Sequence, residues 1–143
     1  MTEQRGRYDA WAALGMKPRT PKASGRKKQQ VTLGEGGASE ADFTATVLEL
    51  AQWGGWLTAH FRPALTQDGH WVTPVAGDGV GFPDLVLVKG TELIIAELKS
   101  ATGRLRPEQT VWLDRLRDAE TIAVEVWRPR DLATIRERLG VAA

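Results

Sequence analysis

The hydrophobic and polar positions become periodic at residue 39 and remain so to the end of the chain. Apolar side chains recur at helical spacing after Ser39, which predicts a helix capped by Ser39 and ended near Gly54. A similar stripe predicts a second helix from Pro107. A last helix is expected to start near Asp131, as its cap, and to run to Gly140.

Short apolar runs between these helices predict β-strands. The expected strands are Trp56–Phe61, Asp84–Val88, Leu93–Lys99 and Ile122–Trp127. A polar, glycine-rich stretch over Arg62–Phe82 is long enough to suggest a functional loop, with a further strand near Trp71–Val75. The main elements follow the order α-β-β-β-α-β-α, which predicts an α/β fold with a mixed β-sheet flanked by helices.

The first 38 residues show no sustained apolar period and carry most of the basic character. Residues 1–30 contain eight lysines and arginines against two acids, whereas residues 31–143 contain eleven against sixteen. We therefore expect a disordered basic arm over 1–38 and one domain over 39–143. Such an arm can neutralise phosphates, or it can be a solubilising linker. Tyr8–Leu14 is long enough for about two helical turns.

Composition excludes several kinds of site. The chain has no cysteine, which excludes disulfides, thiolate zinc sites and cysteine nucleophiles. Its two histidines, His60 and His70, are expected to be structural or to contact substrate rather than to bind metal. No apolar run approaches the roughly 20 residues that span a bilayer, so we expect a cytoplasmic protein without a membrane partner. Any metal here must rely mainly on oxygen ligands.

Two acids interrupt the otherwise apolar strands of the central hairpin. A turn centred between Gly90 and Thr91 sets a register that places Asp84 directly opposite Glu97. Directly opposed β-carbons lie about 4.5–5.5 Å apart, so two like charges destabilise the pair unless a cation lies between them. The hairpin therefore predicts a cation site.

The residue types around this pair favour phosphoryl chemistry. Hard cations such as Mg²⁺ use one or two carboxylates together with water and substrate phosphates. Strand alternation sends Lys99 to the same face as Glu97. Lys99 is suited to orient an attacking water or, as the neutral amine, to deprotonate it, and its ammonium can offset charge on a phosphorane. The alternative is a structural ion-pair network of Asp84, Glu97 and Lys99 with Arg128.

Two more polar residues belong to apolar helix faces. Helical phase places Glu40 on the buried face beside Val47 and Ala51, so we assign it to the site. The alternative is an acid that complements the helix dipole. Gln109 precedes Leu113 by four residues and belongs to the inward stripe of its helix. It is expected to hydrogen-bond within or near the site, or to act as a capping or packing amide.

The segment Pro83-Asp84, a spacer of twelve residues and Glu97-Leu98-Lys99 together resemble the PD-(D/E)XK signature. Flanking residues resemble the VRR-NUC branch of that superfamily over about residues 39–140, in the segments 81–84, 97–100, 103–105, 107–109 and 127–129. The resemblance implies a restriction-endonuclease-like fold, dependence on Mg²⁺ or Mn²⁺, and phosphodiester cleavage that leaves a 5′-phosphate.

The resemblance also implies roles by motif position. The metal ligands would be Asp84, Glu97 and the Leu98 backbone carbonyl, with Glu40, the acid of the first helix, as a further ligand. The catalytic lysine would be Lys99, and the glutamine after the lysine strand would be Gln109. Some relatives resemble phage or bacterial proteins, including dimeric junction-resolving enzymes. Phage replication or packaging proteins and a second copy of the chain are therefore expected partners.

Together these features predict a Mg²⁺-dependent DNA endonuclease, selective for branched DNA such as junctions or flaps. The expected DNA contacts are Arg104, Arg106, Arg128, Arg130, Arg26, Lys27, Lys28 and the loop residue Trp71. The alternative is a catalytically weak nucleic-acid-binding or partner-docking module of phage replication or packaging.

Overall fold

The computed structural model describes residues 39–72 and 74–142. The elements in chain order are α2 (Glu40–Trp53), β1 (Leu57–His60), β2 (Ala64–Leu65), β3 (Trp71–Val72), β4 (Leu85–Lys89), β5 (Glu92–Leu98), α3 (Pro107–Arg117), β6 (Ala123–Trp127), the 3-10 helix η2 (Pro129–Asp131) and α4 (Leu132–Arg138). The predicted basic arm, with its helix at Tyr8–Leu14, lies outside the described residues.

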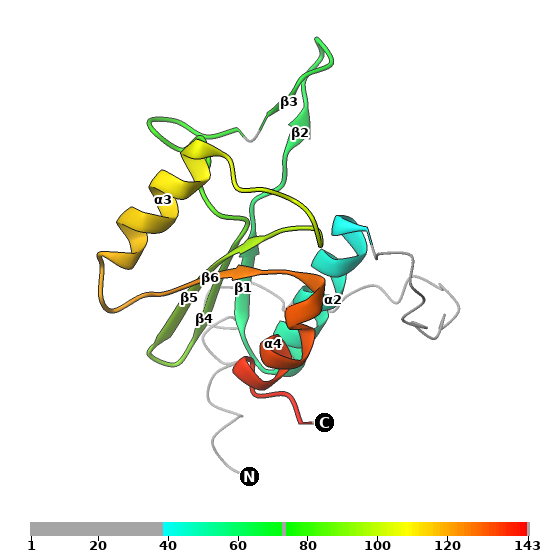
Figure 1. Ribbon diagram of the computed structural model, residues 1–143, viewed down its shortest axis with the longest axis vertical. Helices are drawn as coiled ribbons and strands as arrows, with labels where there is room; N and C mark the ends of the chain where they lie inside the picture. The colour runs from blue at the N-terminus through cyan, green and yellow to red at the C-terminus, as the bar shows by residue number, and fades with distance from the viewer. Residues whose placement is uncertain (1–38, 73, 143) are drawn as a thin grey trace, which may run out of the picture. The chain divides into compact units, whose positions relative to one another are not determined.

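The central sheet has four strands in the order β1-β4-β5-β6. β4 pairs antiparallel with both β1 and β5, while β5 and β6 are parallel and α3 forms the connection between them. For the described residues, a mixed α/β fold with three α-helices is therefore confirmed (Figure 1). The short strands β2 and β3 form a separate two-stranded sheet.

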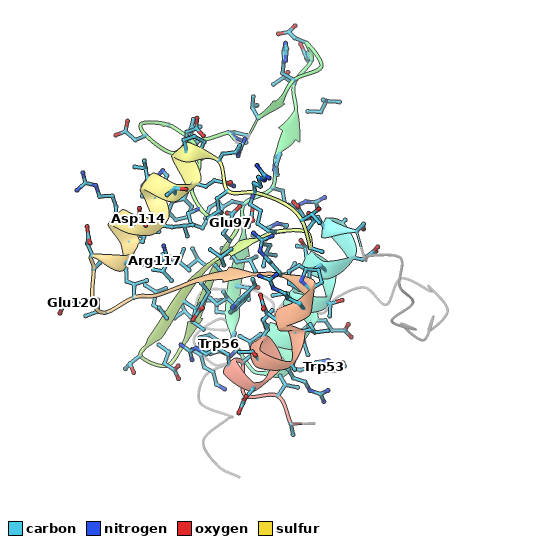
Figure 2. The ribbon with its side chains drawn as sticks, viewed as in Figure 1. Trp53, Trp56, Glu97, Asp114, Arg117 and Glu120 are labelled. Atoms are coloured by element: carbon cyan, nitrogen blue, oxygen red, sulfur yellow. The ribbon has the colours of Figure 1, made fainter. Side chains whose placement is uncertain are left out.

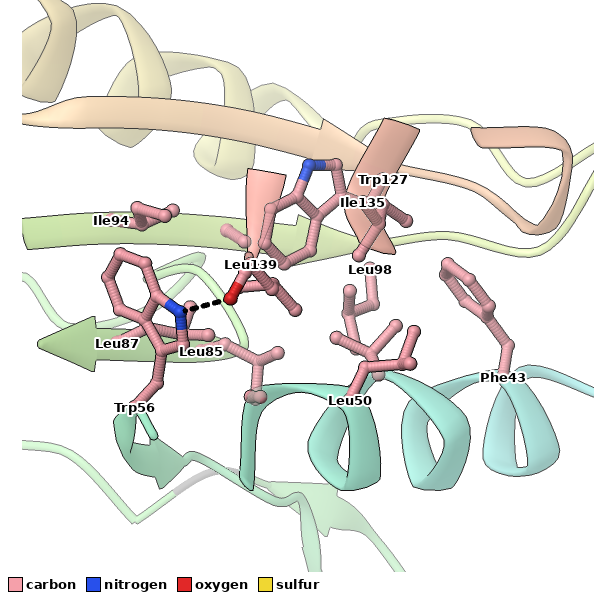
Figure 3. Close-up of a cluster of buried hydrophobic side chains, with 13 residues drawn as sticks. Phe43, Leu50, Trp56, Leu85, Leu87, Ile94, Leu98, Trp127, Ile135 and Leu139 are labelled. Atoms are coloured by element: carbon pink, nitrogen blue, oxygen red, sulfur yellow. Dashed lines mark hydrogen bonds between the residues drawn. The ribbon is translucent and has the colours of Figure 1, made fainter. Parts of the chain in front are cut away.

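Helices cover both faces of the central sheet (Figure 1). α2 and α4 pack on one face, where alternate strand residues form the hydrophobic core (Figure 3). This core consists of Phe43, Val47, Leu50, Ala51, Trp56, Leu85, Leu87, Ile94, Ala96, Leu98, Trp127, Ile135 and Leu139. α3 lies against the opposite face, because its residue Gln109 reaches Glu97, whose side chain alternates with that of Leu98.

Local capping explains where α2 begins and how its end meets α4. The Ser39 hydroxyl accepts a hydrogen bond from the Asp42 N–H at 3.2 Å, as the sequence predicted. At the other end, a Cβ on Gly54 would overlap the Leu139 carbonyl oxygen, so only glycine permits this approach. The same carbonyl accepts a hydrogen bond from Trp56 Nε1 at 3.0 Å, which ties β1 to the end of α4 (Figure 3).

Two local expectations were confirmed in position but not in detail. A strand is present at Trp71–Val72, within the expected range, and it pairs with the unpredicted strand β2. Asp131 does not cap α4 with its side chain; its Oδ2 instead accepts from the Arg128 N–H at 2.9 Å. Asp131 is the last residue of the 3-10 turn η2, and within this turn its carboxylate points back to the Arg128 N–H that precedes the turn. Among the described residues, no helix has both the length and the apolar character needed to cross a membrane.

Candidate functional site

The central hairpin aligns Asp84 with Glu97. β4 and β5 pair with Leu85 opposite Ala96, so the next position along the hairpin sets Asp84 against Glu97. The Leu98 N–H donates to Asp84 Oδ2 at 2.8 Å and thereby fixes the Asp84 carboxylate against β5. The predicted register is confirmed, although Asp84 lies in a bend immediately before β4 rather than within the strand.

Glu97 is the buried acid of the site. Its side chain is 1% exposed and lies between the sheet and α3 (Figure 2). Lys99 Nζ lies 2.7 Å from Glu97 Oε1, and Gln109 Nε2 donates to the same oxygen at 2.5 Å. The second oxygen, Oε2, is buried and accepts no hydrogen bond from the described residues. Since buried polar atoms are normally satisfied, this oxygen needs a further partner.

The pKa of Glu97 also indicates that this carboxyl group needs a further partner. Burial raises the pKa of the Glu97 carboxyl to about 7, because the anion loses hydration. The ion pair with Lys99 acts against this increase in pKa, and the neighbouring Asp84 carboxylate adds to it. One ammonium is therefore insufficient to offset the buried charge, and the site favours additional positive charge.

Gln109 connects the site to the start of α3. Its side chain is 5% exposed, which confirms the predicted inward position. Its Oε1 accepts from the Arg106 N–H at 3.0 Å, while its Nε2 donates to Glu97. The amide therefore caps α3 and orients the acid with one side chain, so both interpretations drawn from the sequence apply.

Gly81 allows the loop before Asp84 to pack against α3. Its φ of +84° is in the left-handed region that favours glycine. A Cβ at this position would lie 2.6 Å from the Glu108 carbonyl carbon and 2.8 Å from the Gln109 nitrogen. The Gly-Phe-Pro-Asp segment can therefore hold Asp84 and the first turn of α3 together only with glycine at its first position.

Arg128 has a structural role that the sequence did not indicate. Its Nη1 donates to the carbonyl oxygens of Ser100 and Gly103, at 2.8 Å and 2.7 Å. These bonds hold the loop that follows Lys99. No ion pair joins Arg128 to the site acids in the described part of the chain, which argues against the alternative of a structural ion-pair network that includes Arg128.

The other predicted DNA contacts differ in how far the structure describes them. Arg104, Arg106 and Arg130 are exposed, as a phosphate contact requires. The remaining candidates, Arg26, Lys27 and Lys28, lie outside the described residues. The backbone of Trp71 forms part of β3, but its side chain is not among those described.

Glu40 does not join the buried site. It is exposed in the first turn of α2, and the first buried side chain of that helix is Phe43. Helical phase predicted a buried Glu40, whereas burial in α2 begins only at Phe43. Within residues 39–72 and 74–142, no three His, Cys, Asp or Glu side chains gather in a metal-binding group. The expected burial of Glu40 was therefore wrong.

His60, at the end of β1, lies close enough to Asp84 for their charges to interact. Burial lowers the pKa of its imidazole, the Asp84 carboxylate acts in the opposite direction, and Arg62 adds to the decrease. The net effect favours a neutral ring.

A pocket of about 480 Å³ adjoins the site, and sequence patterns did not predict it. Its lining includes Phe61, Val75, Asp78, Phe82, Arg106 and Trp112. Phe61 directly follows β1, Arg106 directly precedes α3, Trp112 lies in α3, and the others belong to the long loop. The Gly-Phe-Pro-Asp segment, which contains Phe82, was the one sequence feature that could have indicated this pocket. The sequence did not indicate that Trp112 lines a pocket, because an apolar stripe on a helix usually packs into the core.

Comparison with known families identifies the segment that holds these features. The VRR-NUC domain matches residues 65–131, which include Asp84, Glu97, Lys99 and Gln109 but neither α2 nor α4. Comparisons with curated proteins and with solved structures find no match to the chain. Over residues 65–131 this chain is therefore similar to the VRR-NUC domain, a family of PD-(D/E)XK-like nuclease domains.

Proposed function

We propose that this protein is a Mg²⁺-dependent DNA endonuclease whose site is formed by Asp84, Glu97 and Lys99. The observation that carries the proposal is the buried Glu97 Oε2, which accepts no hydrogen bond from the described residues and lies in a hairpin that opposes Asp84. An oxygen in that position is suited to a cation. The match to a nuclease domain family over the same residues supports this assignment.

The residues present fit a hard divalent cation. Asp84 and Glu97 would hold it, with the Leu98 backbone carbonyl as a further ligand by motif position. The Leu98 N–H fixes Asp84 by Oδ2 alone, which leaves the other carboxylate oxygen as a ligand. Two carboxylates suit Mg²⁺, which usually retains several waters, and Mn²⁺ can substitute because it accepts the same oxygen ligands. When bound, the ion supplies Lewis-acid charge against the phosphate oxygens.

The side chains of the protein itself account for the remaining steps of hydrolysis. Hydrolysis joins a water oxygen to phosphorus and breaks the bond to the 3′ oxygen, which leaves a 5′-phosphate and a 3′-hydroxyl. Lys99 is 13% exposed, so its ammonium can meet solvent and substrate while it remains paired with Glu97. We assign it to orient the water and to offset the charge that grows on the phosphate. Gln109 is a positioning residue, because it acts through Glu97.

The charge distribution favours branched DNA over continuous duplex as the substrate. Residues 31–143 carry more acids than lysines and arginines, so nonspecific duplex binding would depend on the basic arm. Recognition by the domain itself would depend more on DNA shape, with Arg104, Arg106 and Arg130 as exposed phosphate contacts. Junctions and flaps provide such shapes.

A cleavage panel tests the proposal. The full chain is incubated with duplex, flap, single-stranded and four-way DNA, in Mg²⁺ or in a chelator. We expect cleavage of branched DNA in Mg²⁺ alone. Asp84→Asn, Glu97→Gln and Lys99→Met should each reduce the rate roughly 100-fold or more, because each removes one charged group from the reacting centre.

Glu49→Gln is the matched control, since Glu49 is exposed on α2 and does not belong to the site. It should cut like the wild type. Circular dichroism should show that all variants keep the fold, because each of the two acids is replaced by an amide of the same shape. Binding in both conditions without cleavage would instead identify a DNA-binding module, and full activity in all three site variants would refute the residue assignment.

A further inference from the structure

The pocket beside the site has aromatic walls. Phe61 and Phe82 meet edge to face, with ring centroids 5.4 Å apart and planes at 80°. Phe82 meets Trp112 in the same manner, with centroids 5.0 Å apart. Trp112 Nε1 donates to the Asp78 carbonyl oxygen at 2.9 Å, so the long loop is tied to α3 and the walls are held in place. The pocket therefore does not need to form around its ligand.

Two residues that line the pocket, Phe61 and Arg106, are hydrogen-bonded to residues of the site. The Phe61 N–H donates to the Asp84 carbonyl oxygen at 2.9 Å, and Phe82 precedes Asp84 by two residues. The Arg106 N–H donates to Gln109, which itself donates to Glu97. These bonds connect the pocket walls to the residues that hold the site, so a group bound in the pocket would lie near a phosphate bound there.

The size and chemistry of the pocket suit a nucleobase. Its volume of about 480 Å³ falls within the range of small-ligand pockets, roughly 300–1,000 Å³. Aromatic side chains stack on bases of any sequence, and an adjacent arginine can contact the neighbouring phosphate. Phe61, at the open edge, is 38% exposed, and Arg106 is exposed as well. These two residues offer a ring and a cation to an incoming nucleotide.

We propose that this pocket binds one unpaired nucleobase of the DNA strand that the site cuts, an inference that rests on the nuclease function proposed above. A base within a duplex is stacked and paired, so it cannot enter without being extruded. The pocket therefore selects DNA that has an unpaired nucleotide next to the scissile phosphate. A flap meets this condition, whereas a continuous duplex does not.

An abasic scan in a chelator tests this proposal without requiring cleavage. The probe is fluorescein-labelled flap DNA in which one nucleotide at a time is replaced by an abasic tetrahydrofuran. For the full wild-type chain we expect one position at which loss of the base weakens binding roughly 10- to 100-fold. Replacement at the other positions should have a much smaller effect.

The pocket variants should remove this dependence. Phe61→Ala should weaken binding of the intact flap by a similar factor. For this variant, removal of the base at the sensitive position should not weaken binding any further. Phe61→Leu keeps apolar volume without a ring and should give the same pattern, which protects the test against a folding defect. Trp53→Ala is the aromatic control, because Trp53 is 66% exposed and does not line the pocket. It should retain the wild-type profile.

The outcomes distinguish the two proposals. A wild-type profile without a sensitive position, or one that Phe61→Leu leaves unchanged, overturns base binding even if the flap is cut in Mg²⁺. Association of the chain with itself that depends on Phe61, without a sensitive position, would make the pocket a protein contact and also overturns the inference. If one position is sensitive but no DNA is cut in Mg²⁺, the nuclease proposal fails and the base-binding proposal stands.

Discussion

Glu97→Gln should change how the stability of the metal-free protein depends on pH. The carboxyl is 1% exposed, and burial raises its pKa from the usual 4.5 to about 7 in the folded chain. The folded state therefore binds this proton more tightly than the unfolded state does. The resulting stabilisation is fully present below pH 4.5 and is lost as the pH rises to about 7.

The magnitude follows from the size of this difference in pKa. Each pKa unit corresponds to about 1.4 kcal/mol, so the loss across the interval is on the order of 3 kcal/mol. Glutamine has nearly the same shape and cannot titrate. The free energy of unfolding of Glu97→Gln, relative to wild type, should therefore increase by about 3 kcal/mol between about pH 4 and about pH 8.

Urea unfolding in a chelator, followed by tryptophan fluorescence at each pH, measures this difference. Comparison of the two proteins cancels the titration of the other acids. Glu49→Gln should run parallel to wild type, because Glu49 is exposed on α2. If Glu97→Gln also runs parallel to wild type, the Glu97 carboxyl titrates normally, and the electrostatic reasoning about the site is refuted.

Three further changes test how the site is held and reached. Gly81→Ala should destabilise the fold by about 1–3 kcal/mol more than Gly69→Ala does. Both glycines have a positive φ, but of the two only a Cβ at Gly81 would meet backbone atoms within 4 Å. Equal losses of stability in thermal unfolding would exclude that clash. Gln109→Leu should cost about 1–3 kcal/mol, because Glu97 and the Arg106 N–H each lose a partner, and an unchanged melting temperature would contradict this. Deletion of residues 1–37 should weaken duplex binding and flatten its salt dependence, whereas an identical salt slope would show that the arm does not contact phosphates.

The sequence was sufficient for the parts of the molecule that local rules determine. Ser39 caps α2 because its hydroxyl is three residues from an N–H that needs an acceptor. The turn at Gly90 determined the hairpin register, and with it the opposition of Asp84 and Glu97. The inward position of Gln109 followed from helical spacing alone.

Features that depend on tertiary packing could not be predicted in this way. Helical phase predicts a buried Glu40 but does not give where along α2 burial begins. The use of Arg128 to hold the loop after Lys99 depends on where β6 ends relative to that loop. The aromatic pocket joins Phe61 and Trp112, which lie about fifty residues apart, and no periodic pattern connects them.

Cation binding in the absence of DNA is the most direct test of the central claim, which is that Asp84 and Glu97 share one hard divalent cation. Titration calorimetry of the full chain with Mg²⁺ and with Mn²⁺, above pH 7, should detect a single site. Asp84→Asn and Glu97→Gln should each abolish that site, and Glu49→Gln should retain it. Binding that is equally strong in both site variants would place the cation elsewhere and would contradict the claim.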